Sequence, residues 1–256
     1  MEISLSDSGR GLEIECDDAT IPQGPGNLVH RACVLWRKAR RLQGGIQIRL
    51  VKGIPSGSGL GGASSDAAAT LLGLERLTGD RLGQAVRFKL ARELGSDVPL
   101  FLWGGRVLGC GRGEEVYPLA DLPVRHCLIV FPGFSVSTSD AYREASLRLT
   151  KNAGPARMKI LGEWPPFPLD RWGPAENDFE KVVFARWPML ARLKAQLIRA
   201  GAEVASLTGS GSAVFALFDS ARKLHQAANL VPQGWQIFQT RTQTRPEYLR
   251  TVTSEE

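Results

Sequence analysis

The chain has 256 residues, of which 43% are hydrophobic and 23% are charged. This balance is typical of a globular protein with an apolar core and excludes a disordered chain. The net charge of +6 suits a nucleic-acid-binding protein or an enzyme that handles phosphorylated substrates. The second class is favoured, because no nucleic-acid-binding motif accompanies the charge. No apolar run is long enough to cross a membrane, so neither nucleic acid nor membrane is an expected partner.

The four cysteines are far apart in the sequence and include no C-x-x-C pair. With only three histidines in the chain, they indicate neither a zinc site nor a disulfide framework, and we expect reduced thiols. The N-terminus lacks the basic and apolar regions of a signal peptide, which predicts a cytoplasmic protein.

The first fifty residues predict two short strands, a helix and a third strand. Alternating hydrophobicity over residues 1–6 and 11–16 indicates strands around a Ser-Asp-Ser-Gly turn, and residues 45–51 alternate again. Residues 27–42 have a helical period. The helix is expected to bury one face, which carries Leu28, Ala32 and Leu35. The third strand is expected to point inward with Ile46, Ile48 and Leu50.

Two helices and further strands are predicted before residue 122. Helical patterns cover 64–77 and 82–94, and Gly95 ends the second. The segment 96–119 is interpreted as a turn followed by strand-like segments.

The sequence changes character near Leu122-Pro123, which predicts an N-terminal domain of residues 1–123 and a C-terminal domain of residues 124–256. The second domain is expected to run strand, helix, strand, strand, helix, strand, the ferredoxin-like order, giving an α+β protein. These elements are expected at 126–131, 188–201, 203–207, 213–218, 220–230 and 235–241. The proline-rich segment 163–174 is expected to be a surface connection.

A glycine run before the helix at residue 64 is the strongest candidate for a binding site. Its glycines are Gly57, Gly59, Gly61 and Gly62. A dinucleotide fold would need a second strand with an acid after the helix, and a Walker A loop would need a terminal Gly-Lys-Ser/Thr; neither is present. The run therefore predicts a polyphosphate site at a helix N-terminus, with a packed glycine turn as the structural alternative. Ser64, Ser65 and Asp66 are candidate helix caps, and Ser65 is also a candidate Mg²⁺ ligand.

The segment "IPSGSGLGGASSDAAATLLGLERL" resembles the ATP-binding signature of the GHMP kinases, although Ala63 replaces a frequent glycine. "GSDVPLFLWGG" (95–105) and "SLTGSGSAVFALF" (206–218) resemble two further segments of those members that act in the non-mevalonate isoprenoid (terpenoid) pathway. "GNLVHRA" (26–32) and "NDFEKVVFARWPML" (177–190) are similar as well. The resemblance implies an N-terminal domain like domain 2 of ribosomal protein S5 and a ferredoxin-like C-terminal domain.

The resemblance also implies a function. It implies ATP-dependent phosphorylation, with Mg²⁺, of a small alcohol joined to cytidine diphosphate, by a monomer or homodimer. Asp97 is implied as the catalytic base; a turn-forming aspartate is the alternative. The residues implied to bind ATP are Asn27, Leu28, Pro55, Ser56, Gly57, Ser58, Gly59, Leu60, Gly61, Gly62, Ala63, Ser64 and Ser65. Those implied at the substrate are Thr138, Tyr142, Gly209, Ser210 and Gly211. Lys52 is expected either to add charge at the phosphates or to be a solvated strand-end lysine.

Relatives of this kind begin with a strand carrying Pro-Ala-Lys-(Ile/Leu)-Asn-Leu and then an Asp-Gly-Tyr-His segment, and neither occurs here. We expect translated sequence upstream of Met1 to contain the missing lysine and histidine. Two alternatives stay open: a GHMP kinase for another alcohol such as homoserine or mevalonate, and a non-catalytic nucleotide-binding relative.

Overall fold

The computed structural model describes residues 1–6, 11–41, 44–144, 172 and 175–253. The chain forms two compact units. The N-terminal unit comprises Met1–Ile54, Gly61–Asp121 and Thr244–Glu256, and the C-terminal unit comprises Pro55–Leu60 and Leu122–Gln243. The long segment of the C-terminal unit begins at Leu122, beside the predicted boundary. A single boundary there misplaces two segments: Pro55–Leu60 belongs to the C-terminal unit, and Thr244–Glu256 belongs to the N-terminal unit. The domain limits 1–123 and 124–256 stay a prediction.

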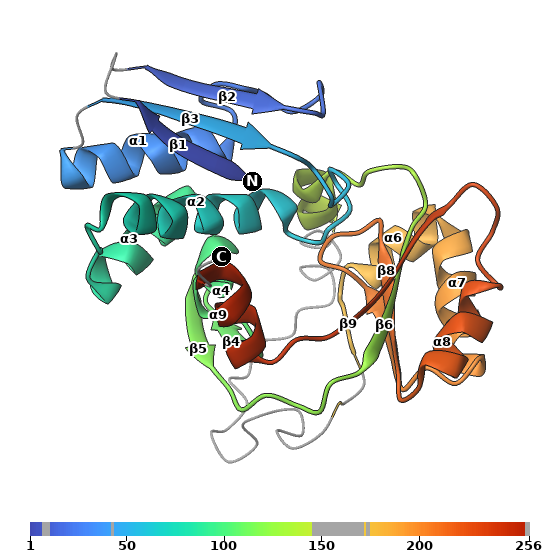
Figure 1. The fold of residues 1–256 in the computed structure, drawn as a ribbon. Coiled ribbons are helices and arrows are strands. Elements are labelled where there is room, and N and C mark those ends of the chain that lie inside the picture. Colours follow the sequence, from blue (N-terminus) through green and yellow to red (C-terminus); the bar gives the residue numbers. More distant parts are fainter. Residues whose placement is uncertain (7–10, 42–43, 145–171, 173–174, 254–256) are drawn as a thin grey trace, which may run out of the picture. The chain divides into compact units, whose positions relative to one another are not determined.

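A three-stranded sheet forms one layer of the N-terminal unit (Figure 1). Strand β3 (Gly45–Leu50) lies in the middle, antiparallel to β1 (Glu2–Ser6) and parallel to β2 (Leu12–Cys16). The strands predicted for residues 1–51 are therefore confirmed. Their inward side chains are buried as expected, because alternate residues of a strand point to the same face. These side chains are Ile46, Ile48 and Leu50.

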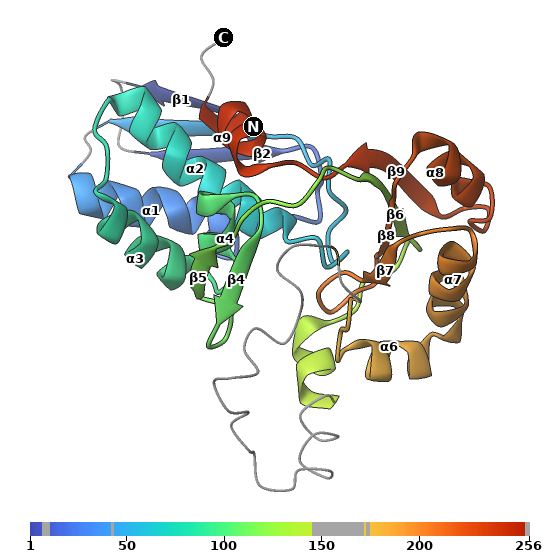
Figure 2. The same cartoon turned by 90° about the horizontal axis from the view of Figure 1, so that it is seen from below.

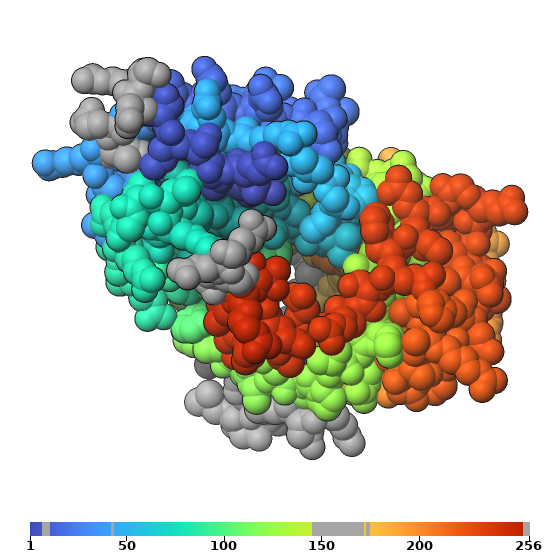
Figure 3. All heavy atoms as spheres, viewed as in Figure 1, coloured from blue at the N-terminus to red at the C-terminus, as the bar shows by residue number. Residues whose placement is uncertain are grey.

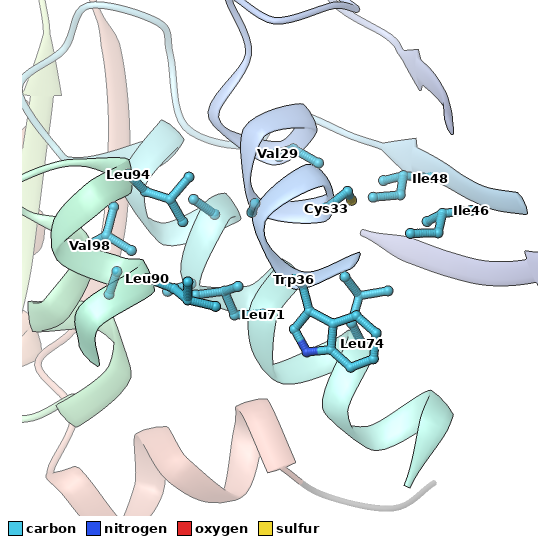
Figure 4. Packing of buried hydrophobic residues seen from close by; sticks show 14 of the residues in the cluster. Val29, Cys33, Trp36, Ile46, Ile48, Leu71, Leu74, Leu90, Leu94 and Val98 are labelled. Carbon is cyan, nitrogen blue, oxygen red and sulfur yellow. The ribbon is translucent and has the colours of Figure 1, made fainter. Parts of the chain in front are cut away.

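Three helices pack with this sheet: α1 (Leu28–Arg40), α2 (Gly62–Thr78) and α3 (Gln84–Leu94). They match the helices predicted from the sequence. The buried face of α1 differs, because Leu28 and Leu35 are only half-buried. The buried stripe is Val29, Ala32, Cys33 and Trp36, which follows the i, i+3, i+4, i+7 spacing and places the large indole in the core (Figure 4).

The strand-like interpretation of residues 98–103 is wrong, because this segment is helix α4 (Val98–Trp103). A short apolar run has no periodicity that separates strand from helix. Pro99 lies in the first turn, where its missing N–H costs nothing. Gly104, with φ of +61°, ends the helix. The strands that follow are present: β4 (Val107–Cys110) and β5 (Glu115–Pro118) pair as an antiparallel hairpin.

Helix α9 (Arg245–Thr253) belongs to the N-terminal unit, where it contacts α2. Figure 3 shows it in red against the teal of α2. The Tyr248 hydroxyl donates to the Phe101 carbonyl at 2.7 Å. The Arg245 guanidinium donates to the carbonyls of Gly104, Arg106 and Leu119. The chain end thereby fixes the turn that follows α4.

The C-terminal unit is built on an antiparallel sheet in the order β7-β8-β6-β9. Its strands are β6 (His126–Phe131), β7 (Val204–Leu207), β8 (Val214–Phe218) and β9 (Gln236–Arg241). Its helices include α6 (Glu180–Arg186), α7 (Pro188–Arg199) and α8 (Ala221–Ala228). Helices α7 and α8 cover one face of the sheet (Figure 1). This arrangement confirms the ferredoxin-like prediction. The connection expected at 163–174 lies outside the described residues, apart from Trp172.

Candidate active site

The first half of the glycine run lies against the glycine turn between β7 and β8. The Ser58 carbonyl accepts hydrogen bonds from the Ala213 N–H at 3.0 Å and from the Thr208 hydroxyl at 2.8 Å. Gly59 has φ of +80°, and a Cβ there would lie 2.1 Å from the Thr208 carbonyl oxygen. A Cβ on Gly57 would lie 2.3 Å from the Ser135 Cβ. Only glycine permits both this conformation and this approach.

The turn between β7 and β8 brings several predicted residues together. Gly209 and Gly211 have φ of +49° and +89°, and the Ser210 hydroxyl lies 3.0 Å from that of Thr138. Pro55–Leu60, Gly209–Gly211 and Thr138 therefore form one cluster inside the C-terminal unit. From the sequence, only the family resemblance indicates that these residues lie close together.

The second half of the run begins helix α2. The helix starts at Gly62, with Gly61 (φ of +71°) as its N-cap and without a side-chain cap hydrogen bond. The expectation that Ser64, Ser65 or Asp66 caps the helix is therefore wrong, because all three lie inside it. Since the first main-chain helix bond joins the Ser65 N–H to the Gly61 carbonyl, the earlier N–H groups are available to an anion at the positive end of the helix dipole.

A cation lies next to this helix start. The ammonium group of Lys52 forms a salt bridge and hydrogen bond with the Asp66 carboxylate, and the two side chains are only 10% and 23% exposed. The Lys52 Nζ is 3.6 Å from the position of a Cβ on Gly62. Lys52 is therefore not a solvated strand-end lysine; its charge is held by Asp66 beside the N-terminus of α2.

Asp97 is the N-cap residue of α4, and it is exposed without a side-chain cap hydrogen bond. The Phe101 ring, one turn further along α4, lies 2.9 Å from the position of a Cβ on Gly61. The start of α4 and the start of α2 are therefore neighbours within the N-terminal unit. Asp97 thus stands at a helix start, directly before Val98 and Pro99.

Asn27 is used as a helix cap. Its side chain is buried (7% exposed), accepts from the Val29 N–H at 2.8 Å and donates to the Pro22 carbonyl at 2.9 Å. The neighbouring Leu28 packs half-buried against the core. The polar atoms of Asn27 thus position α1, and a contact between the nucleotide and this pair stays a proposal.

Tyr142 is 56% exposed, so its ring is not part of the hydrophobic core. Its ring meets Phe179 edge to face, with centroids 4.8 Å apart and planes at 82°. This contact leaves part of the ring open to solvent, where a base can stack on it.

Two residues that were not predicted from the sequence hydrogen-bond to the glycine turn between β7 and β8 (Gly209–Gly211, the second glycine turn) or to the strand end before it. The Asn177 amide donates to the carbonyls of Leu207 and Gly209 at 3.0 and 2.8 Å. The Glu180 carboxylate accepts from the Ser206 hydroxyl and the Leu207 N–H, both at 3.0 Å, and from Lys194. The only signal was the family resemblance of 177–190, because nothing local links this segment to a turn some thirty residues away.

The described parts of the chain contain no group of three or more His, Cys, Asp or Glu residues that could hold a metal ion. Among these same residues, no helix has both the length and the apolar character needed to span a membrane.

Comparisons with known proteins agree with this architecture. The model of the GHMP kinases N terminal domain matches residues 27–105, and that of the GHMP kinases C terminal domain matches residues 170–235. The fold and the glycine loop thus define the class of GHMP kinases, small-molecule kinases with an ATP phosphate donor. A homoserine kinase structure from Cytophaga hutchinsonii (TM-score 0.69, 22% identity, covering 94% of this chain and 84% of that one) shares the fold.

More specific similarity comes from three proteins named 4-diphosphocytidyl-2-C-methyl-D-erythritol kinase or its equivalent. The Solibacter usitatus protein is 44% identical over 80% of this chain and 66% of its own length, slightly below two thirds. The Citrifermentans bemidjiense protein is 36% identical over 94% of this chain and 85% of its own. A crystal structure of a 4-(cytidine 5'-diphospho)-2C-methyl-D-erythritol kinase has a TM-score of 0.71 and 32% identity, covering 94% and 85%. The chain belongs to the 4-diphosphocytidyl-2-C-methyl-D-erythritol kinase family.

Proposed function

We propose that this protein transfers the γ-phosphate of ATP to the 2-hydroxyl of 4-diphosphocytidyl-2-C-methyl-D-erythritol, in the non-mevalonate isoprenoid pathway. The observation that carries the proposal is the 36% identity with the Citrifermentans protein over 94% of this chain. The glycine loop adds physical support, because glycines have no side chains that would keep a polyphosphate away from the main-chain N–H groups.

ATP is proposed to bind along the glycine run, with the adenosine at Asn27 and Leu28 and the phosphates at residues 55–65. The start of α2 fits such a ligand, because the first main-chain helix bond begins at the Ser65 N–H and the N–H groups before it have no partner within the helix. The second glycine turn, Gly209–Gly211, is proposed to complete this loop cluster. Its main-chain groups would help to neutralise the phosphate charge.

Asp97 is proposed to accept the proton of the attacking hydroxyl. It is exposed at the start of α4 and makes no cap hydrogen bond, so its carboxylate is available to a substrate. Mg²⁺ would neutralise charge on the phosphates when bound, and Ser65 is the proposed ligand from this chain. Because Asp66 is engaged with Lys52, it is not assigned to the metal.

The acceptor is proposed to be recognised through its cytidine by Thr138 and Tyr142. The open part of the Tyr142 ring suits stacking on a base. The Thr138 hydroxyl, paired with Ser210, would connect this pocket to the second glycine turn.

The proposal is tested by measuring ADP release with ATP, Mg²⁺ and a panel of three acceptors. These are 4-diphosphocytidyl-2-C-methyl-D-erythritol, called the cytidyl alcohol from here on, homoserine and mevalonate. The panel is assayed with the 256-residue chain and with one extended by translated upstream sequence. The proposal predicts turnover with the cytidyl alcohol and none with homoserine or mevalonate. Turnover with homoserine or mevalonate instead would contradict the substrate. Binding of an ATP analogue without turnover in both chains would favour a non-catalytic relative.

A further inference from the structure

The hairpin between β4 and β5 ends in a tip, Cys110–Glu114, that has a fixed shape. The Gly113 N–H donates to the Cys110 carbonyl at 2.9 Å, and the Arg112 N–H donates to the Glu114 carboxylate at 2.8 Å. Main-chain hydrogen bonds from Glu114 itself and from Arg112, together with the nearby charge of the Arg112 side chain, hold the pKa of the Glu114 carboxyl below its usual range. Gly111 and Gly113 have φ of +66° and +102°, so glycine suits both positions. The tip is therefore a defined turn whose carboxylate is charged at neutral pH.

The tip lies beside the proposed catalytic carboxylate. A Cβ on Gly113 would be 4.0 Å from the Asp97 Oδ1, and the hairpin contacts α4, which Asp97 caps (Figure 2). The Arg92 side chain on α3 donates to the Glu114 carbonyl at 3.4 Å, which ties the tip to the same unit. Because Gly113 has no side chain, the space next to Asp97 is not filled from this side.

Arg112 projects from this tip into solvent. Its side chain is 86% exposed, and its nearest acidic partner is the Glu114 carboxylate, 3.7 Å from the Arg112 Nε. That distance is too long for a hydrogen bond. Within the part of the chain that the structure describes, the two terminal guanidinium nitrogens make no hydrogen bond. A cation with free donors thus stands one residue from the glycine that faces Asp97.

We propose that Arg112 is a specificity-determining residue that binds the phosphate groups of the acceptor. This inference rests on the proposed function, in which the hydroxyl that receives the phosphoryl group belongs to a molecule that already carries a diphosphate. A guanidinium presents paired N–H donors that match phosphate oxygens. With the acceptor hydroxyl at Asp97, the cation favours alcohols that bear phosphoester groups and gives no advantage to uncharged alcohols.

The charged groups around the tip support this assignment over a merely solvated arginine. Asp97 and Glu114 both present carboxylates here, which repel an anionic acceptor. Arg92 is engaged with the Glu114 carbonyl. Arg112 is therefore the cation on the tip whose terminal donors are free to offset this repulsion.

The test is a calorimetric titration of the cytidyl alcohol, and separately of cytidine, into the wild-type chain, Arg112→Ala and Arg112→Lys. Arg49→Ala is the matched control, because Arg49 is another exposed arginine (65%) of the same unit, on strand β3. We expect Arg112→Ala to raise the Kd of the cytidyl alcohol by about tenfold or more, the scale of a lost charge-assisted hydrogen bond. Arg112→Lys should raise it less, and Arg49→Ala should leave it unchanged. The Kd of an ATP analogue should be the same in all four proteins.

An unchanged Kd for the cytidyl alcohol in Arg112→Ala would overturn the inference, as would an equal loss of affinity for cytidine, which has no phosphate. Binding and turnover are separate readouts. Wild-type protein that binds the cytidyl alcohol but releases no ADP, both as the 256-residue chain and as the extended one, would refute the proposed function, while the Arg112 comparison would still be decided by the titrations. Failure of both wild-type forms to bind the cytidyl alcohol at all would refute both proposals.

Discussion

Replacing Gly59 with alanine is the most direct physical test of the glycine loop. The new Cβ would lie 2.1 Å from the Thr208 carbonyl oxygen and 2.9 Å from that of Gly211. Both obstacles are backbone atoms of the turn between β7 and β8, so no side-chain rotation relieves the overlap. Gly59 also has φ of +80°, a region that alanine adopts at a cost.

The expected loss of stability has two parts. The left-handed conformation costs an alanine about 1–2 kcal/mol, and overpacking against fixed atoms adds about 1–3 kcal/mol. Gly59→Ala should therefore lower the free energy of unfolding by about 2–5 kcal/mol. Gly234→Ala is the matched control, because Gly234 lies in the same unit with φ of +85° and has nothing within 4 Å of its would-be Cβ. Gly234→Ala should therefore lower the free energy of unfolding only by the cost of the left-handed conformation.

Both variants are compared with the wild type by urea unfolding, followed by tryptophan fluorescence. A larger loss for Gly59→Ala than for Gly234→Ala is expected, with similar urea dependence in all three proteins. The Kd of an ATP analogue, measured well below the unfolding range, should rise only in Gly59→Ala. Equal losses of stability in the two variants would refute the packing of the loop against the second glycine turn.

Three further predictions concern the two units separately. Lys52→Met should lower the free energy of unfolding by about 1–3 kcal/mol by leaving the Asp66 carboxylate unpaired, and adding Asp66→Leu should recover part of the loss; additive losses in a double-mutant cycle would count against the salt bridge. Glu180→Gln should cost about 1–3 kcal/mol, whereas Asp178→Asn, in an exposed ion pair, should cost under about 0.5 kcal/mol; similar urea midpoints would contradict this. Burial raises the pKa of the Cys33 thiol from 9.0 to about 12. Below pH 9 the thiol is neutral in both the folded and the unfolded protein, so the free energy of unfolding keeps its full value. Above pH 9 only the unfolded protein ionises the thiol, so the free energy of unfolding falls until the pH passes the folded pKa. Between pH 9 and about 10.5 this should remove about 2 kcal/mol, and Cys33→Ala should show a shallower fall over the same range; parallel curves would refute the burial effect.

The sequence predicted best where periodicity and packing coincide. Strand β3 is an example, because its alternation of apolar and polar residues decides both its structure and its buried face. Helix α4 shows the limit: Val98–Trp103 is too short and too uniformly apolar for its period to be read. On α1 the helix was found but its face was misplaced, because Trp36, rather than the leucines, occupies the core. The choice of face depends on the neighbouring sheet, which the local sequence does not contain.

For the site, the glycine pattern predicted a bare backbone at a helix start, and the start of α2 has that form. It did not predict that Lys52 is paired with Asp66, that Gly59 packs against Thr208, or that Glu180 holds the second glycine turn. Each of these contacts joins residues from separate elements, so it follows from tertiary packing alone. Asp97, the glycine run and the substrate residues were assigned by family resemblance, and their catalytic roles stay proposals.

The central claim is that Asp97 helps this protein to place a phosphate on the 2-hydroxyl of the cytidyl alcohol. The most direct measurement is ³¹P NMR of the product formed from ATP, Mg²⁺ and the cytidyl alcohol by the wild type and by Asp97→Asn, in the chain form that shows the higher ADP release. The account predicts a new phosphomonoester at that hydroxyl with the wild type. It also predicts a fall of about a hundredfold or more in rate with Asp97→Asn, the scale of a lost general base, at unchanged affinity for an ATP analogue. Equal rates in the two proteins, or a phosphate on a different hydroxyl, would contradict it.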